Sequence, residues 1–222
     1  MSASPKAIPD LHRNPLSEAQ EFRGFRFFKH HGGRYVAKWQ GQPVRATHII
    51  HIRRNPLDVF LSYMNAISAN VTNTAVLPFD SVEAIAGTDL FNMYFDTFIV
   101  TGHVAPRFSV ETGDYFSHNR YWLTYGDKPI AHIRYEDLLS SPRQTLGFLK
   151  DWLKIDDSDI VAMLDRASQG TRKNGKFYWR QQEKNYFNFL TREQIDKFLK
   201  YRGEECRALG YDPDYLATPP NR

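Results

Sequence analysis

The sequence predicts an α/β domain with a mainly parallel central sheet, and two observations carry the prediction. Residues 48–52 and 129–134 are short, largely apolar segments typical of strands. Each is followed by a segment in which apolar residues recur at helical spacing. Strands that alternate with helices along a chain favour a parallel sheet covered by helices.

The composition is that of a globular protein. Of the 222 residues, 41% are hydrophobic and 14% aromatic, which is enough for one sizeable core. The net charge of +4 comes without a long basic run, which fits an anionic small molecule better than nucleic acid. The single cysteine, Cys206, excludes an intrachain disulfide and a cysteine-based metal cluster.

No segment has the character of a membrane span or a signal peptide. The apolar run 90–100 is too short to cross a bilayer and contains Asp96. Residues 1–15 lack a signal-like apolar core. We therefore expect a cytoplasmic protein without a membrane span.

The chain divides into an irregular arm, residues 1–24, which is polar and proline-rich, and a folded domain, residues 25–222. Strands are expected at 25–29, 48–52 and 129–134, and helices at 56–70, 81–85, 90–100, 117–124, 143–154 and from 157 onward. A basic loop follows over 170–184. The oxygen of Ser141 is expected to cap the helix over 143–154. Thr191 and Gln194 form a capping-box pattern for the last long helix, and Gly210 is expected to end it.

The stretch 79–98 is rich in aromatic residues, and two interpretations are open. The side chains concerned are Phe79, Phe91, Tyr94, Phe95 and Phe98. Core packing is the more frequent role of such residues. An aromatic lining beside an anion site would also make a pocket for a second substrate.

The turn between the strand at 48–52 and the helix that begins at Pro56 is the strongest functional signal from local sequence. It contains Arg53, Arg54 and Asn55 and leads directly into a helix N-terminus. Free backbone N–H groups and a partial positive charge collect there, so we expect an anion such as a phosphate. The two strand histidines, His48 and His51, are interpreted as neutral core or edge residues.

Three segments resemble those of sulfotransferases that use 3′-phosphoadenosine 5′-phosphosulfate (PAPS). The stretch 52–67, IRRNPLDVFLSYMNAI, is similar to the family's 3′-phosphate-binding segment, V-R-N-P-x-D-x-x-x-S-Y. Upstream, residues 28–31 (FKHH) are similar to the family's K-T-H, with His30 in place of threonine. Downstream, residues 133–155 resemble the family's strand, Y-E-D-L, proline and helix. The blocks occur in family order from about residue 25 onward, which makes the resemblance more specific than any one motif.

The resemblance implies a three-layer α/β/α fold like that of P-loop NTPases. It implies transfer of a sulfuryl group from PAPS to a hydroxyl or amine of a small-molecule or carbohydrate acceptor, with no metal and no nucleic acid. His31 would be the general base and Lys29 would lie beside the sulfuryl oxygens. The alternative for Lys29, His30 and His31 is an ordinary polar strand end. No sequence feature indicates a homo-oligomer, and none is ruled out.

The resemblance also implies the residues that contact the cofactor. Arg54 and Ser62, eight residues apart, would bind the 3′-phosphate, with Arg54 pairing with Asp58 as the alternative. Tyr135 would approach the adenine, or else be a half-buried strand tyrosine. In the basic loop Arg172 is the first candidate, followed by Lys173 and Arg180, and a solvated loop is the alternative.

One family segment has no counterpart in these 222 residues. The family's P-K-S-G-T-T-W loop holds the 5′-phosphosulfate through backbone N–H groups, a lysine and hydroxyls. Residues 4–7 (SPKA) match only its first positions and continue with Ile8 and Pro9 instead of glycine and hydroxyls. The fold is therefore expected without the family's N-terminal strand and loop. Two hypotheses follow. The first is a fragment or mis-started version of a PAPS-dependent sulfotransferase whose missing segment is expected just upstream of Met1 in the gene, and the second is a shortened relative that binds adenosine 3′-phosphate nucleotides without efficient transfer. A P-loop kinase is disfavoured because G-x-x-x-x-G-K-[ST] does not occur.

Overall fold

A computed structural model describes residues 8, 11, 21–30, 38–68, 79–108, 113–171 and 182–220. In chain order its strands and helices are β1 (Glu21–Phe22), β2 (Phe25–Arg26), β3 (Lys38–Trp39), β4 (Gln42–Pro43), β5 (Ile49–Arg53), α1 (Pro56–Ser68), α2 (Val82–Ile85), α3 (Asp89–Thr101), η1 (Pro106–Phe108), α4 (Tyr115–Thr124), β6 (Ile130–Arg134), α5 (Tyr135–Ser140), α6 (Pro142–Thr145), α7 (Leu149–Leu153), α8 (Asp157–Thr171), η2 (Asn185–Asn188), α9 (Arg192–Ala208) and α10 (Pro213–Ala217).

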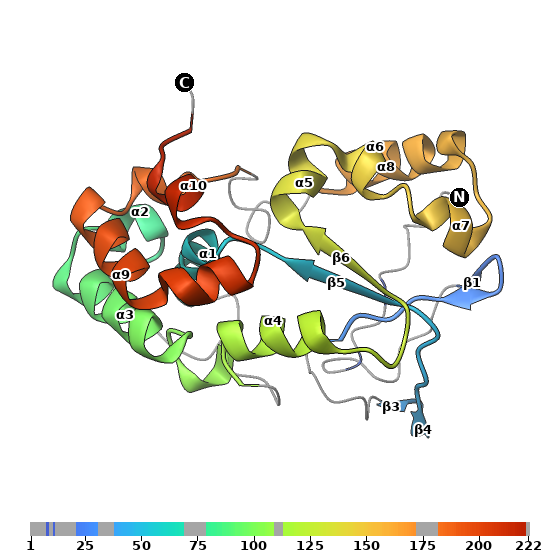
Figure 1. The fold of residues 1–222 in the computed structure, drawn as a ribbon, viewed down its shortest axis with the longest axis horizontal. Coiled ribbons are helices and arrows are strands. Elements are labelled where there is room, and N and C mark those ends of the chain that lie inside the picture. The colour runs from blue at the N-terminus through green and yellow to red at the C-terminus, as the bar shows by residue number, and fades with distance from the viewer. Residues whose placement is uncertain are drawn as a thin grey trace.

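The strands β5 and β6 form a parallel pair at the centre of the described part of the chain (Figure 1). The register pairs Ile49 with Ile130 and Arg53 with Arg134. Each strand runs directly into a helix, β5 into α1 and β6 into α5. Because parallel strands end at the same edge, the starts of these two helices lie next to each other. The predicted strands at 48–52 and 129–134 are therefore confirmed to within one residue.

Helices lie on both sides of this pair, with α4 on one side and α5 to α8 on the other (Figure 1). Helix α4 packs on the face that carries His51, whose ring lies 6.3 Å from that of Trp122. On the opposite face Ile50 and Ile52 remain 40% and 55% exposed, whereas parallel strands are usually buried on both faces. The parallel strand pair with helices on both sides confirms the α/β class.

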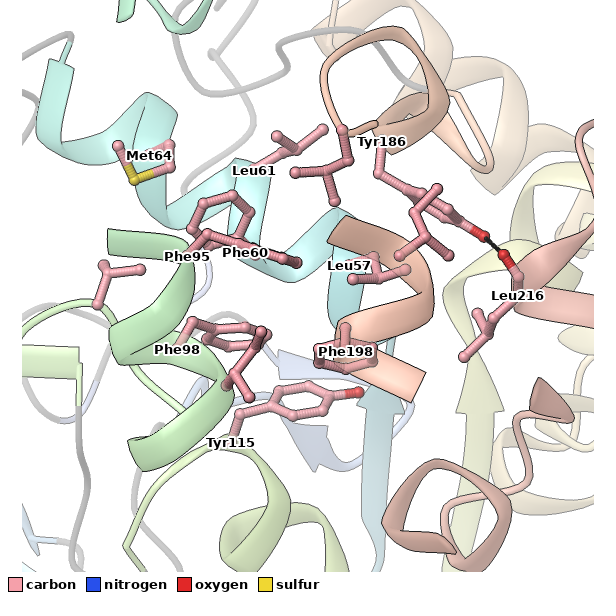
Figure 2. Close-up of a cluster of buried hydrophobic side chains, with 14 of the residues drawn as sticks. Leu57, Phe60, Leu61, Met64, Phe95, Phe98, Tyr115, Tyr186, Phe198 and Leu216 are labelled. Atoms are coloured by element: carbon pink, nitrogen blue, oxygen red, sulfur yellow. Dashed lines mark hydrogen bonds between the residues drawn. The ribbon is translucent and has the colours of Figure 1, made fainter. Parts of the chain in front are cut away.

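The main hydrophobic core lies between α1, α3 and α9 (Figure 2). Phe60 of α1 contacts Phe95 and Phe98 of α3, with ring centroids 4.9 and 5.6 Å apart, and Phe198 of α9 stacks on Phe98 at 6.1 Å. The core interpretation of the aromatic stretch is thus confirmed for Phe91, Phe95 and Phe98. These rings are fully buried and cannot line an acceptor pocket.

The predicted helix over 143–154 is wrong, because the structure has two short helices there, α6 and α7. Gly147 lies between them, and a Cβ at this position would come within 3.0 Å of the Gln144 carbonyl oxygen. Glycine has low helix propensity, so the chain bends there rather than continuing the helix. The expected cap from Ser141 is also wrong, since its side chain makes no capping hydrogen bond.

The other predicted helix boundaries hold more closely. The capping box of Thr191 and Gln194 is confirmed at the start of α9, which ends at Ala208, just before Gly210. The predicted strand over 25–29 is much shorter than expected, because β2 covers two residues and pairs antiparallel with β1. Between them Arg23 and Gly24 have φ values of 51° and 82°, as in a tight hairpin turn.

Candidate functional site

The turn between β5 and α1 is held by its own side chains. Asn55 caps α1, because its Oδ1 accepts a hydrogen bond of 2.8 Å from the backbone N–H of Asp58. Pro56 is the first helical residue, where its missing N–H costs nothing. The Tyr115 hydroxyl donates to the carbonyl oxygen of Arg54. The turn is therefore tied both to its own helix and to the start of α4.

Three of the predicted cofactor residues meet at this turn. The Arg54 guanidinium donates from Nη1 to the Ser62 hydroxyl at 3.3 Å and lies over the Tyr135 ring at 4.6 Å. The residues come from the turn, from the second turn of α1 and from the first position of α5. The Arg54 side chain is 20% exposed, and its Nε is buried without a hydrogen-bond partner in the described residues.

The predicted alternative for Arg54 is present as well. Its Nη2 lies 3.7 Å from Asp58 Oδ2, four residues further along α1, and also donates to the Gln182 carbonyl oxygen at 3.1 Å. Ser62 is fixed in turn by donating to the Asp58 carbonyl oxygen at 3.0 Å. Arg54 is thus preoriented at the N-terminus of α1, with a fork of donors suited to a phosphate.

A buried network behind Arg54 was missed by sequence reasoning. Glu136 Oε1 accepts from the Asn55 backbone N–H at 2.7 Å and from Asn55 Nδ2 at 3.2 Å, and the other carboxylate oxygen accepts from the Tyr211 hydroxyl at 3.1 Å. Asn55 Nδ2 also donates to Asp58 Oδ2 at 2.7 Å. The sequence signal for this network was the presence of polar residues in the segments 52–67 and 133–155. Their pairing across the sheet cannot be read from one sequence. The network locks the start of α1 to the start of α5.

Positive charge collects at the ends of both strands. Arg53 and Arg134 are register partners, and the Arg134 guanidinium lies 4.9 Å from the Tyr211 ring centroid and 3.8 Å from Glu136. Arg53 lies against Gly210 and has two buried nitrogens without a hydrogen bond in the described residues.

Of the remaining predicted site residues, the structure describes only Lys29. Lys29 has an exposed side chain, and its carbonyl oxygen accepts from the Leu11 backbone N–H at 2.9 Å. His31, Arg172, Lys173 and Arg180 lie outside the described residues.

Comparison with known proteins decides the family. Residues 26–210 match the family model of the sulfotransferase domain. The chain belongs to the sulfotransferase family. A match over 185 of 222 residues confirms the resemblance found from the three sequence blocks.

Among solved structures, the chain is similar to mouse sulfotransferase SULT7A1 complexed with PAP, with a TM-score of 0.59 and 19% sequence identity. The alignment covers 83% of this chain and 70% of the mouse chain. At this identity the likeness shows the fold, and it confirms the predicted sulfotransferase-like α/β architecture. No curated protein matches the chain.

Two features are absent from the part of the sulfotransferase chain that the structure describes. No group of three or more His, Cys, Asp or Glu side chains there is placed to hold a metal ion. Within the same ranges, no helix has the length and apolar character required to cross a membrane.

A histidine pair lies in the middle of β5 and β6, on the α4 side of the sheet. His51 Nδ1 is 3.2 Å from His132 Nδ1, and His51 Nε2 is 3.1 Å from Asn119 Oδ1. Burial, together with the nearby His132, His118 and Arg53, lowers the pKa of His51 to about 4. The expectation that His51 is a neutral core residue is confirmed.

This pair predicts a loss of stability in mild acid. Below pH 6.5 the unfolded chain binds a proton at His51, whereas the folded chain does so only near pH 4. The free energy of unfolding should therefore fall by about 1–2 kcal/mol from this group between pH 7 and pH 5. Urea unfolding at both pH values measures it, and the His51→Gln variant should lose less stability over that interval. An equal loss in the variant would assign the pH dependence to other groups.

Proposed function

We propose that this sulfotransferase binds PAPS with its 3′-phosphate at Arg54 and Ser62 and transfers the sulfuryl group to a hydroxyl or amine of a small-molecule or carbohydrate acceptor. The observation that carries the proposal is the convergence of Arg54, Ser62 and Tyr135 at the N-terminus of α1. A guanidinium, a hydroxyl and a helix N-terminus together form a site for a phosphate group. The PAP named for the mouse sulfotransferase is the product that PAPS leaves behind.

Each group has a defined task in this proposal. Arg54 donates two hydrogen bonds to the 3′-phosphate, and the Ser62 hydroxyl turns from the Asp58 carbonyl oxygen to add a third donor. The Tyr135 ring lies where the adenosine reaches the strand ends. Arg172, Lys173 or Arg180 supplies further positive charge for the cofactor phosphates. Lys29 stabilises the negative charge on the sulfuryl oxygens during transfer.

The reaction itself is an in-line displacement. The acceptor oxygen or nitrogen forms a bond to sulfur while the bond from sulfur to the 5′-phosphate oxygen breaks, which leaves adenosine 3′,5′-bisphosphate. His31 takes the proton of the acceptor hydroxyl or amine, a task that suits an imidazole with an ordinary pKa near 6.5. Positioning and charge stabilisation account for the rest of the rate, as in phosphoryl transfer.

The second candidate is a chain that binds adenosine 3′-phosphate nucleotides and transfers sulfate weakly or not at all. The observation in its favour is that no P-K-S-G-T-T-W-like segment occurs in these 222 residues, while Arg54 and Ser62 are in contact at the start of α1. Such a chain would hold one end of PAPS without the groups that activate the other end.

Calorimetry with adenosine 3′,5′-bisphosphate and adenosine 5′-phosphate tests the 3′-phosphate site. We expect the bisphosphate to bind at least about 10-fold more tightly, because one charge-assisted hydrogen-bond set is worth about 1.5–3 kcal/mol. Equal affinities would reject the assignment of Arg54 and Ser62.

Transfer of radiolabelled sulfate from PAPS to a panel of hydroxyl and amine acceptors then separates the two candidates. Transfer that is lost in His31→Ala and kept in His103→Ala supports the enzyme with His31 as base. Undiminished transfer in His31→Ala rejects His31, and bisphosphate binding without any transfer favours the second candidate.

A further inference from the structure

The carboxylate of Asp58 connects the Arg54 turn to a segment more than 120 residues further along the chain. Its Oδ2 accepts from the Lys184 backbone N–H at 3.0 Å, and its Oδ1 accepts from the Tyr186 backbone N–H at 3.2 Å. This segment, residues 182–186, also provides the Gln182 carbonyl oxygen that accepts from Arg54 Nη2 at 3.1 Å. Asp58 and Arg54 therefore bind the same short piece of backbone.

The Asp58 carboxylate is buried at this contact. The residue is 1% exposed, and an ionised carboxylate is stable there only when its oxygens accept hydrogen bonds. The pKa of Asp58 is raised, because its burial outweighs the lowering effect of Arg54, Asn55 and the Tyr186 N–H. Three N–H donors and a guanidinium at 3.7 Å face its two oxygens, so the ionised form is the one that fits.

The segment 182–186 is anchored on its far side as well. Lys184 has a left-handed backbone with φ of 55°, its Nζ donates to the Thr218 carbonyl oxygen at 2.9 Å, and it lies 3.8 Å from the Tyr215 ring centroid. The Tyr186 hydroxyl donates to the Leu216 carbonyl oxygen at 2.7 Å (Figure 2). The side that faces the Arg54 turn is held by Asp58.

We infer that Asp58 is a positioning residue for Arg54: it fixes the backbone of residues 182–186, which places the Gln182 carbonyl oxygen so that the guanidinium points at the 3′-phosphate. Of the Arg54 contacts to Ser62, Asp58 and Gln182, two depend on Asp58, one directly and one through this backbone. The inference rests on the proposed function in naming the phosphate as the target. Its structural half, the hold on residues 182–186, does not depend on any ligand.

Hydrogen exchange without ligand tests the structural half. In Asp58→Ala the amides of Lys184 and Tyr186 should exchange at least about 10-fold faster than in the wild type, because each loses a buried acceptor. Amides in the middle of α9 should be unchanged. Asp89→Ala is the matched control, since it removes an exposed carboxylate from the first turn of α3. Unchanged exchange at both amides would overturn the inference.

Asp58→Asn provides a variant of the same shape if the alanine variant does not fold. Its amide group keeps one acceptor and turns an N–H₂ towards one of the two backbone donors, so at least one of the two amides should still exchange faster.

A double-mutant cycle tests the positioning half by calorimetry with adenosine 3′,5′-bisphosphate. Asp58→Asn should weaken binding about 10-fold in the wild type but less than about 3-fold in Arg54→Lys, because a lysine cannot make the paired contacts that Asp58 arranges. Equal losses in both backgrounds would show a merely structural role and overturn the inference. Absence of any binding to the wild type would instead reject the proposed function, and the exchange experiment would still decide the role of Asp58 in holding residues 182–186.

Discussion

Replacing Arg54 with alanine is expected to weaken the binding of adenosine 3′,5′-bisphosphate by about one to two orders of magnitude. A hydrogen bond to a charged group is worth about 1.5–3 kcal/mol, and each 1.4 kcal/mol is tenfold in affinity. Arg54 has little rotamer freedom left to lose on binding, because Ser62, Gln182 and the Tyr135 ring already hold its guanidinium. Calorimetry of the variant and the wild type at one ionic strength measures the loss.

Arg192→Ala is the matched control for this experiment. Arg192 also forms an ion pair with an aspartate four residues further along its helix, and it also donates to a distant backbone carbonyl, that of Ala217. It lies on the exposed first turn of α9. Its replacement should leave bisphosphate affinity unchanged. An Arg54→Ala variant that binds like Arg192→Ala would remove the 3′-phosphate from this turn.

The local part of this site was predictable from sequence. The spacing of Arg54 and Ser62 follows from helix geometry, which brings a side chain two turns along α1 back to the turn that precedes it. The aspartate four residues after Arg54 offers an ion pair by the same geometry, and the structure has both contacts. The contact of Arg54 with Ser62 and its ion pair with Asp58 are therefore simultaneous interactions of one side chain with five donors.

The part of the site that depends on distant segments was not predictable. Glu136 meets Asn55 because β5 and β6 are neighbours in register, and Asp58 meets residues 184 and 186 because α1 contacts η2. Neither contact leaves a periodic signal in one sequence. In the same way the helix expected over 143–154 had the correct apolar spacing, and only the bend at Gly147 divides it.

The aromatic stretch shows how burial decides between two valid interpretations. The sequence pattern places Phe91, Phe95 and Phe98 on one face of a helix. Such a face can pack in a hydrophobic core or line a pocket. In the structure this face packs on Phe60 and Phe198, so the three rings belong to the hydrophobic core. Tyr115 links this core to the Arg54 turn, because its ring packs near Phe98 and its hydroxyl binds the Arg54 carbonyl.

Phe98→Ala is expected to cost about 3–5 kcal/mol of the free energy of unfolding, the usual range for a fully buried phenylalanine. The ring is at the centre of the aromatic core, with neighbours on α1, α4 and α9, so no single helix can move to fill the cavity (Figure 2). Urea unfolding followed by circular dichroism measures the change. Met93→Ala, at a 54% exposed position of the same helix, should change stability by less than about 0.5 kcal/mol.

The same variant connects the core to the site. Because Tyr115 packs 6.5 Å from Phe98 and donates to the Arg54 carbonyl, a Phe98→Ala chain that remains folded should also bind adenosine 3′,5′-bisphosphate more weakly than Met93→Ala does. A decrease of less than about 1 kcal/mol in the free energy of unfolding of Phe98→Ala would contradict the packing of α3 between α1 and α9. If stability fell as expected and bisphosphate affinity did not, the Arg54 turn would owe its geometry to Asn55, Asp58 and Glu136 rather than to the core beneath it.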